Sequence, residues 1–302
     1  MTDTPLIAGI ELGGTKCVAI LARGPDAIED RIELPTTRPE ETLAALERAI
    51  DGWRGFAALG IASFGPVSID RGSGEYGSIT STPKPGWAHT DVARRLGNRY
   101  RVPTGFHTDV VGAALGEARW GAAAGLADLA YVTVGTGIGV GLVAGGRAVD
   151  GLTHSELGHV RPPRLPDDDW IGGCPFHGAC CEGLASGPAI AARTGVKGQD
   201  LPADDPAWDG VVHAIAHLLY TLVLTGVPRR IVMGGGVMVG NQFLFPRVRA
   251  QMKALLAGYV PLAEIEQADS YVVPAALGAN AGPLGAIVLG INALNETSFT
   301  AA

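Results

Sequence analysis

A glycine hairpin motif that occurs once in each half of the chain constrains the fold more than any other feature. Apolar runs at Leu6–Ile10 and Cys17–Leu21 flank Gly13-Gly14-Thr15, an order that predicts strand, turn and strand. The same order returns across Leu129–Val149, around the turn at Thr133–Gly141. We therefore expect two similar lobes, each opened by a glycine hairpin, with a cleft between them.

The remaining pattern is typical of an α/β protein with mixed sheets. Helical periodicity covers residues 39–53, 91–97, 110–121, 208–225, 242–256 and 283–294. Strand-like apolar runs cover residues 56–69, 102–110, 229–237 and 270–275. We place the N-terminal lobe at residues 1–115, joined by the C-terminal helix at about 283–298, and the C-terminal lobe at residues 116–282.

Composition excludes several classes of protein. Hydrophobic residues make up 47% and charged residues 18%, which supports a sizeable core and excludes wholesale disorder. The net charge is -7 and no block of basic residues occurs, so we expect no nucleic-acid partner. The start of the chain lacks a signal-peptide pattern, and the apolar stretch Val211–Val227 holds two histidines. We expect that stretch to be a buried helix and the protein to be cytoplasmic, with no membrane partner.

The glycine turns suit phosphate binding. Without a Cβ in the way, backbone amides can point at a phosphate, and a threonine adds a hydroxyl donor. One such turn is equally compatible with a plain hairpin, but two favour a pair that holds a polyphosphate from both sides. The run Gly234, Gly235 and Gly236 suits a ribose or flat ring lying on the backbone, and it also suits a helix-capping loop. The candidate phosphate-binding residues are Gly13, Gly14, Thr15 and Lys16 in the first turn, with Thr133, Gly135, Thr136 and Gly137 in the second.

Asp109 follows an apolar strand and precedes a helix. Two roles fit this position. The side chain could be an N-cap that accepts free helix amides. It could also be a general base that takes the proton of an attacking hydroxyl in phosphoryl transfer.

His159, Cys174, His177 and Cys180 form the sharpest constellation. The spacing gives four nitrogen and sulfur ligands, which tetrahedral Zn²⁺ prefers, in a loop (154–182) too poor in apolar residues to fold alone. The whole segment 150–190 is expected to be irregular. Cys181 is adjacent to Cys180, so its side chain points elsewhere. If a metal fixes this loop, Glu156 and Glu182 can be presented to a polyol.

These motifs together resemble the ROK family of sugar kinases, and they cover nearly the whole chain. The forms Ser81–Trp87, Cys174–Gly178 and Gly183–Pro188 are similar to the bacterial fructokinases of that family. The resemblance implies an actin-like ATPase (ribonuclease H-like) fold and transfer of the γ-phosphoryl of ATP to the 6-hydroxyl of D-fructose, with Mg²⁺, a structural zinc and a homodimer. A broader hexose kinase for mannose, glucose or N-acetylhexosamine stays open, since selectivity rests on contacts of about 1–3 kcal/mol each.

Carried over residue by residue, the resemblance implies a base, a nucleotide site and a sugar site. Asp109 is the implied base, and Pro188 joins Gly234–Gly236 at the nucleoside. Glu11 stands where many members have aspartate and is a candidate on the Mg²⁺ side, whereas Thr108 replaces a frequent asparagine. The residues implied at the sugar are Gly65, Lys84, Pro85, Gly86, Trp87, Thr108, Asp109, Glu156, His159 by its free ring edge, and Glu182.

The family also includes transcriptional repressors, which carry a winged helix-turn-helix ahead of the first hairpin. We expect an enzyme here, because the first strand begins near Leu6 and the charge balance is acidic.

Overall fold

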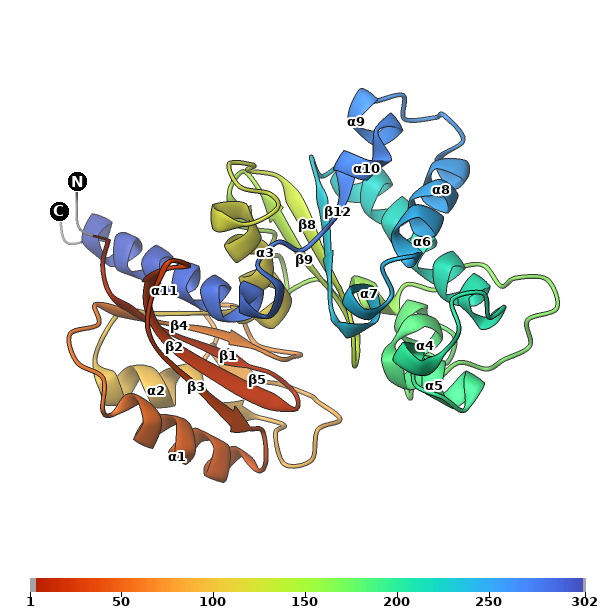
Figure 1. Ribbon diagram of the computed structural model, residues 1–302. Coiled ribbons are helices and arrows are strands. Elements are labelled where there is room, and N and C mark those ends of the chain that lie inside the picture. The colour runs from red at the N-terminus through yellow and green to blue at the C-terminus, as the bar shows by residue number, and fades with distance from the viewer. Residues whose placement is uncertain (1–3, 301–302) are drawn as a thin grey trace. The chain divides into compact units, whose positions relative to one another are not determined.

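The computed structural model describes residues 4–300, which form two compact units (Figure 1). The first unit comprises Met1–Ala124, Arg147–His154 and Leu277–Ala302, and the second comprises Gly125–Gly146 and Ser155–Ala276. The boundary expected at residue 115 would cut a helix, Asp109–Trp120, that the structure keeps whole in the first unit. The segment Arg147–His154 belongs to the first unit although the residues before it belong to the second, and no local pattern in the sequence indicates this.

The first unit contains a five-stranded sheet in the order β3-β2-β1-β4-β7. Strand β1 is antiparallel to β2 and parallel to β4, which is parallel to β7. The elements are β1 (Ile7–Leu12), β2 (Lys16–Gly24), β3 (Ala27–Pro35), α1 (Pro39–Ile50), β4 (Ala58–Ser63), β5 (Ser78–Ile79), β6 (Thr90–Asp91), α2 (Ala93–Tyr100), β7 (Thr104–Thr108), α3 (Asp109–Trp120), β10 (Arg147–Ala148), a 3-10 turn (Gly278–Asn280) and α11 (Ala281–Thr300).

Alternation along the strands divides the side chains of this sheet between two cores. Ile10 and Leu12 of β1 pack with Leu43 of α1 and Leu96 of α2 on one face. Ile7 packs on the other face with residues of α11, which lies across the sheet opposite α1 and α2 (Figure 1).

Helix α11 approaches the sheet closely because glycines line the contact. A Cβ on Gly60 of β4 would lie 1.7 Å from the carbonyl oxygen of Ala286. A Cβ on Gly285 would lie 1.9 Å from the carbonyl oxygen of Gly112 in α3. These glycines therefore set how closely α11 packs on β4 and on α3.

Gly60→Ala is expected to destabilise the protein, because its methyl group overlaps the backbone of α11. We expect a loss of about 1–3 kcal/mol in the free energy of unfolding, measured by denaturant titration. Gly74→Ala is the matched control, since Gly74 is exposed and no atom lies within 4 Å of its added Cβ. Equal stability of the two variants would contradict the close contact.

The second unit repeats the pairing pattern of the first. Its strands β9-β8-β11-β12 pair antiparallel, parallel and parallel, as β2-β1-β4-β7 do in the first unit. The expected pair of similar lobes is thus confirmed. The elements are β8 (Leu129–Val134), β9 (Ile138–Ala144), a 3-10 turn (Leu157–His159), α4 (Cys181–Ala185), α5 (Gly187–Thr194), a 3-10 turn (Gly198–Asp200), α6 (Ala207–Gly226), β11 (Ile231–Gly234), α7 (Gly236–Gly240), α8 (Leu244–Leu256), α9 (Ala263–Glu266), α10 (Ala268–Tyr271) and β12 (Val272–Pro274).

Helix α6 is the central helix of the second core. It is long and apolar enough to cross a membrane by length and composition, but 67% of its most apolar window is buried within the protein. Its Ile215 and Leu219 are fully buried in a cluster with Val132 of β8 and Met233 of β11. The buried helix expected over Val211–Val227 is therefore confirmed.

Candidate functional site

Three parallel strands of the first unit end in register. Leu12 of β1 pairs with Ser63 of β4, and Ser63 pairs with Thr108 of β7. The residues that follow these strand ends are therefore brought to one edge of the sheet: the first glycine turn, the Phe64-Gly65-Pro66 loop and Asp109. Ligands of open α/β sheets bind beyond the carboxyl ends of such strands.

The first glycine turn directs its carbonyl groups to protein donors. Thr36 Oγ1 donates to Gly13 O at 2.7 Å, and Thr36 N donates to Thr15 O at 2.9 Å. Lys84 Nζ donates to Gly14 O at 2.6 Å. Within residues 4–300, the amides of Gly14 and Thr15 donate to no protein acceptor. A turn with its carbonyls bound and two amides available is suited to an anion such as phosphate.

The two lysines near this turn have different partners. Lys16 Nζ lies 3.3 Å from Glu33 Oε2 in an exposed ion pair with β3. The ammonium that contacts the turn belongs to Lys84, which lies far away in the sequence. The sequence predicts Lys16 at this turn because it adjoins the glycines, and it places Lys84 with the residues implied at the sugar. The contact of Lys84 with the turn depends on folding.

Asp109 is the first residue of α3, and Thr108 is its N-cap. The Thr108 side chain accepts from Val111 N, so the capping role proposed for Asp109 is wrong. Thr108 is also buried, with its hydroxyl occupied by the cap. Asp109 Oδ1 accepts from Val110 N at 2.9 Å, and its carboxylate is half-buried at the sheet edge. This carboxylate is oriented by the backbone and remains accessible.

His107, two residues before Asp109, is buried and hydrogen-bonded to Asp150, a contact that the sequence did not predict. His107 Nδ1 accepts from Thr108 N at 2.8 Å, which leaves Nε2 to donate to Asp150 Oδ1, also at 2.8 Å. This bond lowers the pKa of the Asp150 carboxyl. His154 Nε2 accepts from Val67 N at 3.0 Å, beside the Gly65 loop. The Arg147–His154 segment thus anchors both the strand end before Asp109 and the Gly65 loop.

The remaining first-unit candidates differ in exposure. Pro85 and Gly86 are exposed and Gly65 is half-buried. The Trp87 indole is fully buried, donates to Thr37 O at 2.8 Å and packs edge-on against Phe64. The expected contact of Trp87 with a sugar is not available to a side chain with no exposed surface. Trp87 instead anchors the loop that carries Lys84.

Glu11 lies at the end of β1, against the start of α11. Burial raises the pKa of its carboxyl, while Lys16 and Arg31 oppose that effect. Its Oε1 lies only 2.1 Å from where a Cβ on Gly282 would stand, so the glycine leaves room for this carboxylate. A partly desolvated carboxylate beside the first glycine turn is stabilised in its charged form by a nearby cation.

In the second unit, several glycines also lie close together at the ends of adjacent strands. Thr133 pairs with Gly234, so the second turn and Gly235 follow adjacent strand ends. Gly187 N donates to Gly135 O at 2.7 Å, which brings the start of α5, with exposed Pro188, to the turn. Gly235 has a φ of +87°, and a Cβ there would lie 2.4 Å from Val134 O. The second turn, Gly235 and the start of α5 thus lie next to one another, whereas Gly234 is buried inside β11 and is not available to a ligand.

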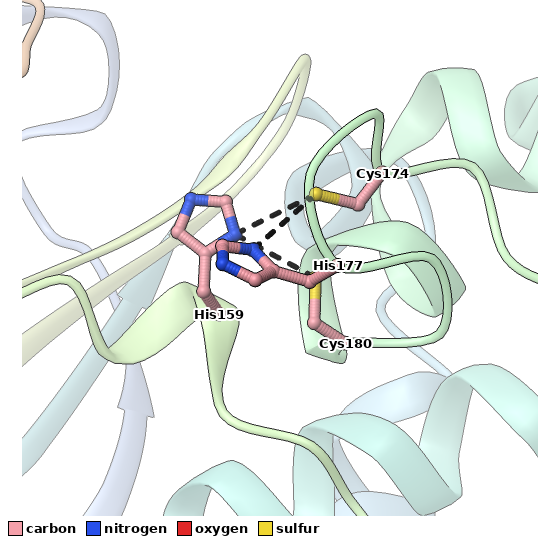
Figure 2. Close-up of side chains that lie close together, drawn as sticks. All are labelled: His159, Cys174, His177 and Cys180. Atoms are coloured by element: carbon pink, nitrogen blue, oxygen red, sulfur yellow. Dashed lines mark hydrogen bonds between the residues drawn. The ribbon is translucent and has the colours of Figure 1, made fainter.

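The four expected metal ligands lie together (Figure 2). Their ligand atoms all fall within 4.8 Å of one another. His159 Nδ1 lies 3.8 Å from Cys174 Sγ and 3.6 Å from Cys180 Sγ, and His177 Nδ1 lies 3.7 Å from Cys174 Sγ. Tetrahedral zinc bonds predict about 3.6 Å between nitrogen and sulfur ligands. The donor set and its spacing fit a zinc ion.

The adjacent cysteines Cys180 and Cys181 lie in different surroundings. Burial raises the pKa of the Cys180 thiol to about 11. Cys181 is fully buried and donates to Ala214 O at 3.4 Å, away from the ligands, as the sequence predicted.

The cluster of candidate metal ligands is connected to the second glycine turn. Gly158, next to His159, packs so closely on β9 that a Cβ would lie 1.8 Å from Ile138 O. Glu182, two residues after Cys180, accepts from Ile138 N at 3.0 Å through Oε2. Glu182 therefore binds the turn, whereas Glu156 is exposed at the start of the 3-10 turn. A metal that holds His159 and Cys180 would also hold the turn.

The segment 150–190 is more regular than expected, because α4 and the start of α5 lie within it. Cys180 and Ser186 are their N-caps, accepting from Gly183 N and Ala189 N. Helices this short give little periodicity, so they left no pattern to recognise.

Comparison with known proteins gives consistent matches. Residues 7–293 match the ROK family. The fructokinase of Pediococcus pentosaceus is 42% identical over 296 residues, covering 96% of this chain and 99% of that protein. The fructokinase of Zymomonas mobilis is 41% identical over 305 residues, covering 97% and 99%. A ROK family glucokinase from Streptomyces griseus, solved with glucose and AMPPNP, has a TM-score of 0.75 at 25% identity and covers 95% and 99%.

Proposed function

The chain belongs to the ROK family and has its actin-like ATPase fold, and from this premise we propose that it is an ATP-dependent fructokinase. The reaction is transfer of the γ-phosphoryl group of ATP to the 6-hydroxyl of D-fructose. The fructokinase relatives at 41–42% identity over nearly the whole chain support the substrate. The observation that carries the chemistry is the shared sheet edge of the first glycine turn and Asp109.

Asp109 would act as the general base. The 6-hydroxyl oxygen bonds to the γ-phosphorus, and the bond from phosphorus to the β,γ-bridging oxygen breaks with its electron pair left on ADP. Asp109 takes the hydroxyl proton and later releases it to water. The Gly14 and Thr15 amides stabilise the charge that develops on the transferred group.

The second unit would bind the rest of the nucleotide. Thr136 and Gly137 donate to no protein acceptor through their amides within residues 4–300, which suits them to phosphate. Gly235, Gly236 and Pro188 present backbone without bulky side chains, a surface on which a nucleoside can lie, whereas Gly234 is buried at the end of β11. Glu156 and the free ring edge of His159 are assigned to sugar hydroxyls.

Two cations belong to this proposal. Mg²⁺ neutralises phosphate charge when ATP binds, and Glu11 is the carboxylate on its protein side. Zinc is held by His159, Cys174, His177 and Cys180 and has a structural role, since the four protein ligands leave no open position. The homodimer and the cytoplasmic location stay predictions.

The test is ADP release measured with D-fructose, D-mannose, D-glucose and N-acetylated hexoses. We expect the highest kcat/KM with fructose, by at least about tenfold, because one or two pocket contacts give that discrimination. The position of the product phosphate, read by phosphorus NMR, should be carbon 6. Equal kcat/KM across the panel would replace this proposal with the broader hexose kinase.

A further inference from the structure

Lys84 connects the 81–87 loop with the first glycine turn. Its Nζ donates to Gly14 O at 2.6 Å, although the two residues lie 70 positions apart. The loop is well anchored near the lysine, because Thr82 Oγ1 accepts from Lys84 N and Trp87 is buried in the first core. The ammonium is therefore held at the turn from an ordered loop.

A cation on this carbonyl acts on the amide at the other end of the same peptide. In a trans peptide the C=O and N–H groups point in opposite directions, so the Thr15 N–H points away from Lys84. A hydrogen bond accepted by the carbonyl polarises the peptide and strengthens its N–H as a donor. No atom lies within 4 Å of a Cβ placed on Gly14, so a ligand can approach the turn.

Lys16 does not supply this charge in the structure. Its ammonium pairs with Glu33 on β3, where both side chains are about half exposed. Lys84 makes no ion pair among the residues that the structure describes, so its charge is not offset by a carboxylate in contact with it.

Resting on the proposed kinase function, we propose that Lys84 is a positioning residue for phosphoryl transfer. Its ammonium fixes and polarises the Gly14–Thr15 peptide, so that the Thr15 amide donates more strongly to the transferred phosphoryl group. This role requires the positive charge of the ammonium group, and the aliphatic part of the lysine side chain only places that charge at the Gly14 carbonyl.

Kinetics of Lys84→Met, Lys84→Arg and Lys16→Met test this assignment, with exposed Lys197→Met as the control for loss of a surface charge. For Lys84→Met we expect kcat to fall by about 10–10²-fold with the KM for fructose within about threefold, because a transition-state donor is weakened and sugar contacts are kept. Lys84→Arg should recover most of the loss, and Lys16→Met should lose less than Lys84→Met. Lys197→Met should match the wild type.

A turnover of Lys84→Met close to wild type would overturn the assignment, as would a larger loss in Lys16→Met. Equal impairment of Lys84→Arg and Lys84→Met would also overturn it, since charge would then not matter. Calorimetry with AMPPNP keeps the two proposals separate. A wild-type protein that phosphorylates no sugar refutes the kinase function, whereas weaker AMPPNP binding by Lys84→Met, restored in Lys84→Arg, still supports the turn assignment.

Discussion

Asp109→Asn is expected to lower kcat by at least about 10²-fold while the protein stays folded, because an amide cannot accept the proton of the sugar hydroxyl. The asparagine side chain has the same shape, and its oxygen can still accept from Val110 N. The cap on α3 comes from Thr108 and is untouched. Turnover is measured by coupled ADP release, and the thermal midpoint and AMPPNP affinity should both stay near wild type.

Asp91→Asn is the matched control for this substitution. Asp91 also lies at the start of a helix and accepts a backbone amide, from Arg94 N at 3.1 Å, but it is on the β5–β6 hairpin and not at the ends of β1, β4 and β7. We expect Asp91→Asn to keep wild-type turnover. If Asp109→Asn retained it too, Asp109 could not be the base.

Loss of the metal cluster is expected to have the second large effect. Purified protein should contain about one zinc per chain, and Cys180→Ser should contain little, because a serine hydroxyl is a poor zinc ligand at neutral pH. Serine is a good N-cap, so α4 keeps its cap and only the ligand is lost. We expect the thermal midpoint to fall by about 10 °C or more, since a structural zinc contributes several kcal/mol to folding.

Turnover should fall with the zinc, by at least about tenfold, because the cluster holds the residues that bind the second glycine turn. Without it, the Glu182 contact with Ile138 N and the packing of Gly158 on Ile138 O both lose their support. Cys181→Ser is the control: its hydroxyl can still donate to Ala214 O, and its zinc content should be normal. A zinc-free protein with wild-type stability and turnover would refute a structural metal.

The family, the fold and the repeated strand pattern were predicted from the sequence and are confirmed. The repeated strand pattern could be predicted because glycine turns and apolar runs are local signals, and the family and its fold were implied by the resemblance of the motifs. The exposed edge strand β3 was missed because most of its side chains are polar or only half-buried, so no apolar run marks it. The lobe boundary was placed at residue 115, inside α3, because nothing local in the sequence marks where the chain leaves one unit.

The sequence by itself determined which residue types are available for chemistry: two glycine turns, a carboxylate after a strand, and four metal ligands at close spacing. These follow from neighbours in the chain, whose steric and hydrogen-bonding preferences act over a few residues. Only the tertiary structure decided their partners. It chose Lys84 over Lys16 for the first turn, buried Trp87, gave the α3 cap to Thr108, and set Glu182 on Ile138 N. Such contacts join residues far apart in the chain, and they form only when sheet register and helix packing bring them together.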